Sequence, residues 1–216
     1  MSDFRIRTCV VGGISTNCYI IYREGENKAV IVDPGDNSAY ILNQCRELSV
    51  EPEAILLTHG HFDHIMALED IRRAFHCSVY AHMDEEEMLR DPALNLSGTM
   101  GTEQTVVNAD HLLRDGEMIS LLRYDWKVIA TPGHTSGSVC YYIASEDVLL
   151  SGDTLFAESL GRTDLPTGSS AAIVRSITEK LLVLPDDTMV YPGHGETTSI
   201  AHEKRYNPVA VYKRGR

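Results

Sequence analysis

Several common features are missing from this 216-residue sequence, and each absence excludes a class of protein. No apolar run approaches the ~18 residues that a membrane-spanning helix needs. Basic residues are few: 19 Lys and Arg stand against 31 Asp and Glu, a formal net charge of -12. Nucleic acids and anionic membranes are bound by basic faces, so we expect neither as a partner. The N-terminal residues 1–5 lack the basic-then-apolar pattern of a signal peptide, which favours a cytoplasmic location.

Motifs of other site chemistries are missing as well. The five cysteines are odd in number, widely spread and never spaced as C-x-x-C, so we expect reduced, buried thiols instead of disulfides or a thiolate zinc site. Gly-x-Ser-x-Gly does not occur, which argues against a catalytic serine. Gly-x-Gly-x-x-Gly is also absent, which argues against dinucleotide binding.

The apolar pattern that is present alternates short strands with helices. Length and a hydrophobic fraction of 43% suit one α/β domain over residues 1–216. Short runs of strand formers occupy residues 18–22, 29–32, 55–57, 79–81, 126–130, 138–143, 148–150 and 189–191. Helical spacing predicts helices over residues 38–49, 65–75, 83–90, 173–181 and 198–205.

Capping and charge signals refine three of these helices. Ser169 or Ser170 is available as the N-cap of the helix over 173–181, and Thr198 as the N-cap of the last one. The acidic run 85–87 falls in the helix over 83–90, where we expect it to form a solvated face.

The strongest local signal is the segment Thr58-His59-Gly60-His61-Phe62-Asp63-His64. In an extended chain, His59 and His61 point to the same side because they are two residues apart. Asp63 and His64 follow where the next helix should begin, so one short turn presents two pairs of ligands. Neutral imidazoles and a carboxylate suit zinc, iron or manganese, so the segment predicts a metal site.

Three later residues have the same character. His134, Asp153 and His194 each follow an apolar strand and stand beside a glycine. Loops at strand ends are where α/β folds collect functional residues. Together with the first motif they make five histidines and two aspartates, which is enough for two adjacent metal ions.

This order of residues resembles the metallo-β-lactamase superfamily. H-x-H-x-D-H is followed by a lone His, a lone Asp and a final His, and the similarity extends from residues 17–19 through 32–35 to 207–208. The segments 161–164 (Gly-Arg-Thr-Asp) and 192–195 (Pro-Gly-His-Gly) resemble the short glyoxalase II-like hydrolases. The resemblance implies an αββα sandwich, in which two mixed β-sheets are flanked by helices and the metals lie at one edge of the sheets.

The resemblance also implies the ligands and the cofactor. One ion would be held by His59, His61 and His134, and Asp153 would bridge it to a second ion. The second ion would be held by Asp63, His64 and His194. We expect two divalent ions, zinc with iron or manganese as alternatives.

The chemistry expected of this site is hydrolysis of a small-molecule acyl thioester such as S-lactoylglutathione. A metal-bound hydroxide would attack the carbonyl, and Asp63 would orient it or accept a proton. A mononuclear iron persulfide dioxygenase is the alternative, because it shares the fold and a similar Gly-Arg-Thr-Asp loop. A lactonase or β-lactamase and a non-enzymatic metal-binding protein remain as lesser alternatives.

Two residues near the ligands are candidates for substrate contact. Arg162 either binds a substrate carboxylate or pairs with Asp164 to stiffen its loop. Phe62 stands between ligands in the sequence, where it either lines the site or packs in the core. Little of the chain after residue 154 is left for the helical C-terminal domain that supplies basic glutathione-binding residues in longer relatives. The oligomeric state is left open.

Overall fold

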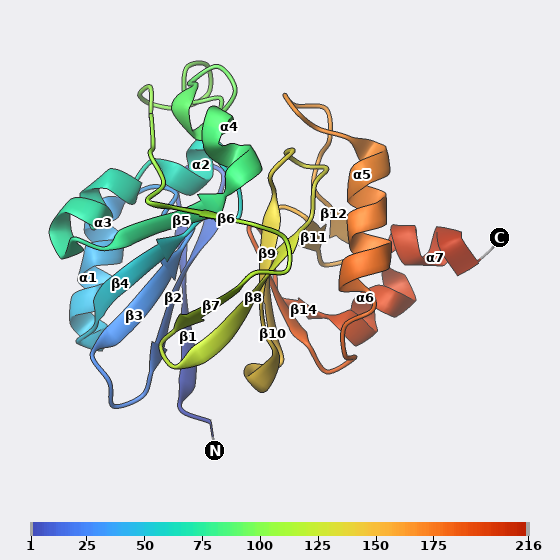
Figure 1. Cartoon of the computed structure of the whole chain (residues 1–216), viewed down its shortest axis with the longest axis horizontal. Coiled ribbons are helices and arrows are strands. Elements are labelled where there is room, and N and C mark those ends of the chain that lie inside the picture. Colours follow the sequence, from blue (N-terminus) through green and yellow to red (C-terminus); the bar gives the residue numbers. More distant parts are fainter. Residues whose placement is uncertain (1, 215–216) are drawn as a thin grey trace.

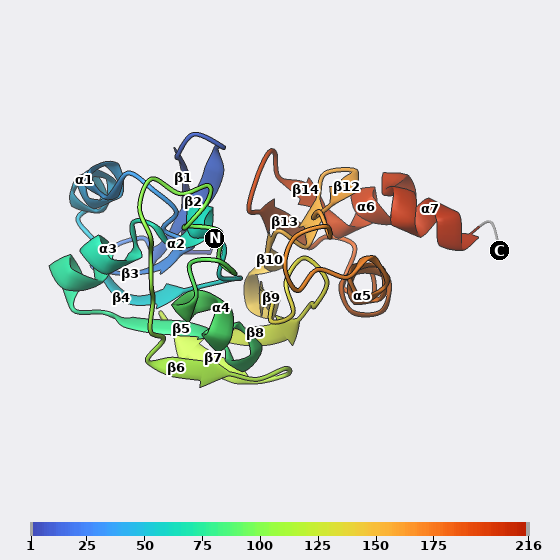
Figure 2. The same cartoon turned by 90° about the horizontal axis from the view of Figure 1, so that it is seen from above.

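In the computed structural model, which describes residues 2–214, two β-sheets face each other and helices cover both outer sides (Figure 1). Seen from above, the four layers follow one another across the molecule (Figure 2). The predicted αββα sandwich with two mixed sheets is therefore confirmed. Every helix in the described part of the chain is too short or too polar to span a membrane.

The first sheet has the strand order β1-β2-β3-β4-β5-β6. Its strands are β1 (Phe4–Val11), β2 (Thr16–Arg23), β3 (Lys28–Val32), β4 (Glu51–Leu56), β5 (Ser78–His82) and β6 (His111–Leu113). The first three are antiparallel neighbours, and β2 and β3 form a hairpin. From β3 to β6 the pairing is parallel, which brings the carboxyl ends of β3 and β4 to the same edge.

The second sheet has the order β14-β13-β10-β9-β8-β7. Its strands are β7 (Met118–Leu121), β8 (Tyr124–Ala130), β9 (Val139–Ile143), β10 (Val148–Gly152), β13 (Met189–Pro192) and β14 (Thr198–Ser199). A small hairpin of β11 (Leu155–Phe156) and β12 (Ser159–Leu160) lies beside it. β10 is parallel to β13, and both β10 and β8 are antiparallel to β9, which lies between them. The three strands β8, β10 and β13 therefore run in the same direction and end at one edge.

The helices divide between the two outer faces (Figures 1 and 2). The first sheet is covered by α1 (Ser38–Leu48), α2 (Phe62–Ile65) and α3 (Leu68–Phe75), with α4 (Glu86–Arg90) near its upper edge. The second sheet is covered by α5 (Ser170–Arg175), which continues into a π-helical turn, and by α6 (Ile200–Tyr206). The last helix, α7 (Pro208–Arg214), follows α6 directly.

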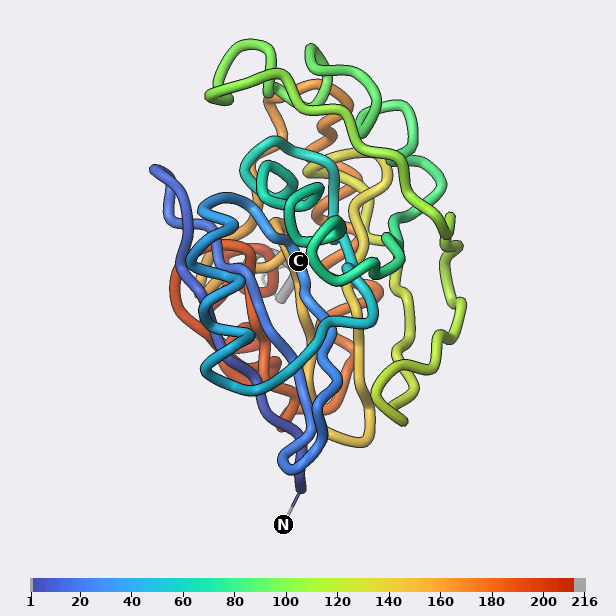
Figure 3. The backbone as a smooth tube through the Cα atoms, turned by 90° about the vertical axis from the view of Figure 1, so that its left-hand side faces the viewer, coloured from blue at the N-terminus to red at the C-terminus, as the bar shows by residue number. Residues whose placement is uncertain are grey.

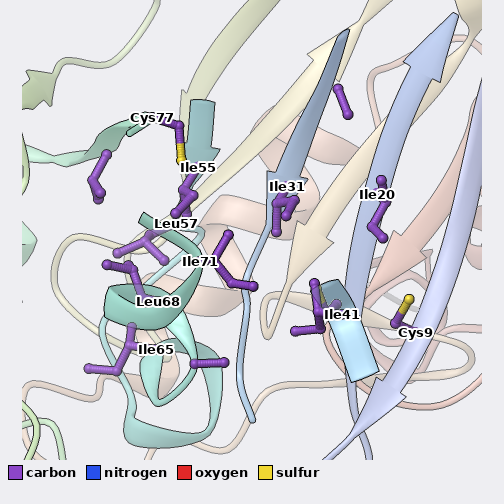
Figure 4. Packing of buried hydrophobic residues seen from close by; sticks show 14 of the residues in the cluster. Cys9, Ile20, Ile31, Ile41, Ile55, Leu57, Ile65, Leu68, Ile71 and Cys77 are labelled. Carbon is purple, nitrogen blue, oxygen red and sulfur yellow. The ribbon is translucent and has the colours of Figure 1, made fainter. Parts of the chain in front are cut away.

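Alternating side chains of the strands build two different cores. On β2, Ile20 points to the helices α1 to α3, where it meets a cluster that includes Ile41, Ile65 and Leu68 (Figure 4). Its neighbours Tyr19 and Ile21 point the other way, into the layer between the sheets with the buried Trp126 and Tyr141 of the second sheet. The two-residue period of a strand thus serves both layers.

Each predicted strand and helix has a counterpart in the structure, but ends and continuity differ. The helix expected over 65–75 is two helices, because α2 ends at Ile65 and α3 begins at Leu68. Ser199, not Thr198, caps α6, and its hydroxyl accepts a hydrogen bond from the amide of His202. The five cysteines are free and buried, as expected.

The acidic run at residues 85–87 corrects a prediction. Glu87 is exposed, but the side chain of Glu85 is 1% exposed and lies in the interior. Met88 and Leu89 stand three and four residues later on the same helical face and are also buried. The run is therefore not a solvated face throughout, and Glu85 turns inward with the apolar side of the helix.

Candidate metal centre

The seven predicted ligands come together where strands of both sheets end. β4 leads into the segment with His59, His61, Asp63 and His64, and α2 begins at Phe62 within it. The loops after β8, β10 and β13 bring the three remaining residues, His134, Asp153 and His194. A bridge between Thr16 and His194 joins the two sheets beside this point.

Three histidines form the first group. One ring nitrogen from each of His59, His61 and His134 lies within 4.8 Å of the others. His61 Nδ1 and His134 Nε2 are 2.9 Å apart, and all three side chains are buried. Two lone pairs that face each other at this distance suit a shared cation or one bridging proton.

The second group combines one carboxylate with two histidines. Asp63, His64 and His194 each offer an atom within 4.8 Å of the other two. Asp63 Oδ2 lies 3.3 Å from His64 Nε2 and 3.2 Å from His194 Nε2. The hydroxyl of Thr16 donates to the same oxygen at 2.8 Å, which fixes the orientation of the carboxylate.

Asp153 lies between the two groups. Its Oδ2 is 3.6 Å from His134 Nε2 in the first group and 3.5 Å from His194 Nε2 in the second. Its Oδ1 is 3.5 Å from His64 Nε2. A carboxylate whose Oδ2 lies between the two groups, while its Oδ1 faces His64 of the second, has the position of a bridging ligand.

The other ring nitrogens of three of the histidines are held from outside. His59 Nδ1 is 3.1 Å from the hydroxyl of Thr58, and His134 Nδ1 is 2.8 Å from the carbonyl of Arg162. His194 Nδ1 is 3.2 Å from the carbonyl of Ile14. Such outer partners fix the tautomer and leave Nε2 unprotonated toward the site, as a metal ligand requires.

Asp33 is a functional residue that the sequence reasoning missed. Its Oδ2 lies 3.0 Å from His64 Nδ1 and accepts a hydrogen bond from the hydroxyl of Thr58, while its Oδ1 accepts from the Thr58 amide. One buried carboxylate therefore positions both His64 and the residue before His59. In the sequence, Asp33 is followed by Pro34-Gly35, which explains why β3 stops but does not show what the carboxylate contacts.

The pKa values of His59, His61 and Asp63 favour the protonation states of metal ligands. Burial and the neighbouring histidines hold the pKa of His59 well below its ordinary value, and burial together with His134 lowers that of His61 to about 3. Burial alone would raise the pKa of Asp63, but the adjacent His64 and His194 hold it well below the ordinary range. Neutral imidazoles and an ionised carboxylate are the forms that bind a cation. At His64 and His194 the neighbouring carboxylates overcome burial and raise the pKa, so these two histidines would give up a proton on binding a cation.

Gly193 leaves room that a larger residue would close. A Cβ there would lie 2.1 Å from Asp153 Oδ1 and 2.8 Å from His64 Cε1. Only a residue without a side chain lets the loop after β13 approach Asp153 and His64 so closely. The glycine beside His194 is therefore part of the construction of the site.

Glu85 is a second residue whose position was not predicted. Its Oε1 accepts a hydrogen bond from the hydroxyl of Thr135, which follows His134, and its other oxygen has no partner. A Cβ on Gly60, between His59 and His61, would lie 3.4 Å from that oxygen. Burial raises the pKa of Glu85 to about 7. Glu85 thus lies between the two loops that carry the first group.

A pocket of about 420 Å³ opens over the ligands. Phe62 and Arg162, the two candidates for substrate contact, both line it. Arg162 also pairs with Asp164, with Nε and Nη2 each 2.8 Å from a different carboxylate oxygen. The predicted stiffening pair therefore exists, and it lies at the wall of the pocket.

Sequence comparisons agree with the predicted family. The family model for the metallo-beta-lactamase superfamily matches residues 11–194. The probable metallo-hydrolase YqgX of Bacillus subtilis (strain 168) is 40% identical over 203 residues, which cover 94% of this chain and 95% of YqgX. The hydroxyacylglutathione hydrolase GloC of Haemophilus influenzae (strain ATCC 51907 / DSM 11121 / KW20 / Rd) is 32% identical, with 92% of this chain and 94% of GloC covered.

Solved structures agree as well. The B3 metallo-beta-lactamase BLEG-1 has a TM-score of 0.91 and 40% identity, over 96% of this chain and 100% of that one. TTHA1623, crystallised in a di-iron-bound form, has a TM-score of 0.82 and 32% identity, over 94% and 98%. With its family model, its relatives and its fold in agreement, this chain belongs to the metallo-beta-lactamase superfamily, whose members bind divalent metals.

Proposed function

We propose that this protein is a metal-dependent hydrolase of acyl thioesters. In the reaction the bond from the acyl carbon to sulfur breaks, a bond from that carbon to the oxygen of water forms, and the thiolate takes a proton. One observation carries the proposal: three buried polar atoms without a hydrogen-bond partner, Nε2 of His59 and His64 and Oδ1 of Asp153, belong to the same cluster. Buried polar groups are normally paired, so this set fits a cation.

The donors divide into two sets of the kind that zinc, iron or manganese accepts. His59, His61 and His134 would hold one ion. Asp63, His64 and His194 would hold the other, and Asp153 would stand between them. The di-iron form of TTHA1623 supports a pair of ions in this fold.

When bound, divalent ions supply a hydroxide nucleophile near neutral pH and polarise the carbonyl oxygen of the substrate. The residues of the chain do the rest. The carboxylate of Asp63, oriented by the Thr16 hydroxyl, orients the attacking water and accepts its proton. Phe62 shields one side of the reacting group from water, since it lines the pocket beside the ligands.

A thioester suits this site because its thiolate leaves readily without a dedicated acid. The name of the relative GloC, a hydroxyacylglutathione hydrolase, supports this substrate class. β-Lactam hydrolysis is the second candidate, because the B3 metallo-beta-lactamase BLEG-1 matches almost the whole chain. Both reactions attack a carbonyl and differ in the group that leaves.

The experiment is elemental analysis of the purified chain, followed by assays with S-lactoylglutathione, S-acetyl-N-acetylcysteamine and a cephalosporin. We expect two divalent ions per chain and turnover of a thioester. His59→Ala should abolish turnover, whereas His202→Ala, which removes a histidine of α6 outside the site, should keep it.

Three results would contradict the proposal. Turnover of the cephalosporin without any thioester would favour the lactamase. One iron per chain with oxygen uptake on glutathione persulfide would favour the dioxygenase. No turnover of any of these compounds by the metal-loaded chain would favour a binding protein.

A further inference from the structure

The pocket over the ligands has an apolar wall. Six of its residues are Ile14, Phe62, Leu96, Met100, Phe156 and Leu160, which we call the apolar wall. They come from the β1–β2 hairpin tip, the start of α2, the segment 91–110 and the β11–β12 hairpin. The hairpin tip and the segment 91–110 rise at the same end of the molecule (Figure 3).

Two residues of the apolar wall are exposed to solvent to an unusual degree. Ile14 is 52% exposed and Met100 is 55% exposed, although both are large and apolar. Both line the same pocket. Exposed apolar side chains that line a pocket are typical of a surface that covers an apolar ligand.

The charge of the pocket points in the same direction. Apart from the histidines of the metal site, Arg162 is the one cationic residue among the residues that line the pocket. The Nε and Nη2 groups of Arg162 both donate to Asp164, so the Asp164 carboxylate already balances the charge of the guanidinium. An acyl chain that ends in a carboxylate would need a cationic or donor partner at the pocket, and the paired Arg162 does not offer one.

We propose that the substrate of the metal centre is a thioester with an uncharged, apolar acyl chain that lies on the apolar wall, and that the Arg162–Asp164 pair selects against acyl chains that end in a carboxylate. This inference rests on the proposed thioester hydrolysis and names its substrate class. The reacting carbonyl lies over the ligands, and the chain extends along Phe62 and Leu160 toward Met100.

The test compares thioesters that share one leaving group and differ only in the acyl chain. Acetyl, hexanoyl and adipoyl thioesters of N-acetylcysteamine are given to the metal-loaded full chain. Each buried methylene contributes roughly fourfold in affinity, so kcat/KM should be about tenfold or more higher for hexanoyl than for acetyl. Adipoyl, which ends in a carboxylate, should lose most of this gain. Equal rates for hexanoyl and acetyl, or a preference for adipoyl, would overturn the proposal.

Two variants test the residues. Met100→Gln should reduce the preference for hexanoyl over acetyl, whereas Met118→Gln, at an equally exposed methionine outside the pocket, should leave it unchanged. Asp164→Asn should release the Arg162 guanidinium and raise kcat/KM for adipoyl by about tenfold, the effect of one hydrogen bond to a charged group. No gain for adipoyl in Asp164→Asn would contradict the role given to the pair.

A binding measurement separates this inference from the proposed reaction. Calorimetric titration uses two thioethers of N-acetylcysteamine that cannot be hydrolysed, one with an S-hexyl chain and one with an S-(5-carboxypentyl) chain. Tighter binding of the S-hexyl compound supports the apolar wall even if no thioester is turned over, in which case only the proposed reaction fails. Equal or weaker binding of the S-hexyl compound overturns the inference even if thioesters are hydrolysed.

Discussion

Asp33 shows how one residue outside the ligand set controls it. Its carboxylate accepts two hydrogen bonds from Thr58 and faces His64 Nδ1 at 3.0 Å. Asp33→Asn keeps the shape of the side chain but places an NH₂ group where Thr58 and His64 need a hydrogen-bond acceptor. Loss of such an outer partner typically costs 10- to 100-fold in metal affinity. We expect a loss of about that size, measured by zinc competition against a chromophoric chelator.

The control for Asp33 lies three residues further along the same loop. Asp36 is half-buried and accepts a hydrogen bond only from the neighbouring Asn37 amide. Asp36→Asn makes the same chemical change without touching a ligand, so its zinc affinity should equal that of the unaltered chain. Equal affinity in Asp33→Asn as well would show that Asp33 only terminates β3.

Glu85 predicts a pH dependence of stability. Burial raises its pKa from 4.5 to about 7, so the folded state keeps the proton that the unfolded state loses first. The contribution of this proton to the free energy of unfolding is complete below pH 4.5 and is lost as the pH rises through about 7. Over that range the unfolding free energy of the unaltered chain, relative to Glu85→Gln, should fall by about 3 kcal/mol. Urea denaturation of both proteins at pH 5 and pH 8 measures this difference.

Glu87 supplies the matched control, because it is exposed two residues away on the same helical segment. Glu87→Gln should follow the pH dependence of the unaltered chain within about 0.5 kcal/mol, the usual range for surface changes. A pH dependence of Glu85→Gln that matches the unaltered chain would mean that Glu85 is ionised in the folded protein.

These residues also mark what the sequence can predict at this scale. The seven predicted ligands lie close in the chain or follow strand ends next to glycine, so local spacing finds them. Asp33 and Glu85 act on residues 25 and 50 positions away, Thr58 and Thr135. No local pattern reports a contact across such a distance. The helical phase of Met88 and Leu89 would have placed Glu85 inside, but its charge favoured the surface.

At the scale of elements, α5 supports the loop that carries His134. Ser169 caps the helix, its hydroxyl accepting from the amide of Ala172 at 3.3 Å, while its own amide donates to the Gly133 carbonyl. Ser169→Ala removes the cap and should lower the unfolding free energy by about 1 kcal/mol. Chemical denaturation at constant metal concentration measures the loss.

Ser170 decides whether the cap is the cause. Sequence alone allowed either serine to cap the helix, but the Ser170 hydroxyl contacts only that of Thr163 at 2.6 Å. Ser170→Ala should therefore change the unfolding free energy by less than about 0.5 kcal/mol. If both substitutions cost the same, the serine hydroxyls contribute through local polarity and not through a cap.

The elements differ in how well the sequence predicts them. Buried strands such as β3 and β10 appear as apolar runs because both of their faces pack against other layers. The edge strand β1 is partly exposed, and the strands β11, β12 and β14 have only two residues each. None of these four strands therefore gives a clear apolar pattern in the sequence. The break between α2 and α3 was hidden because the apolar spacing continues across it.

At the scale of the whole molecule, the site joins the two halves of the sandwich. His59, His61, Asp63 and His64 follow the first sheet, and His134, Asp153 and His194 follow strands of the second. Each proposed ion would therefore have ligands from both sheets. The carboxylates of Asp63 and Asp153 add to the net charge of -12, so bound cations also reduce repulsion within the fold.

Metal removal should therefore destabilise the entire fold. A ligand present at 1,000 times its dissociation constant stabilises the folded state by about 4 kcal/mol, provided that it binds only that state. In a chain of this length, 4 kcal/mol corresponds to roughly 8–16 °C in melting temperature. Differential scanning calorimetry of chelator-treated protein, with and without added zinc, should show a rise of this size. His59→Ala should lose the part of the response that comes from the ion it would hold, because a ligand is gone, and His202→Ala on α6 should keep the full response. A zinc response in His59→Ala equal to that of the unaltered chain would place the stabilising ion elsewhere.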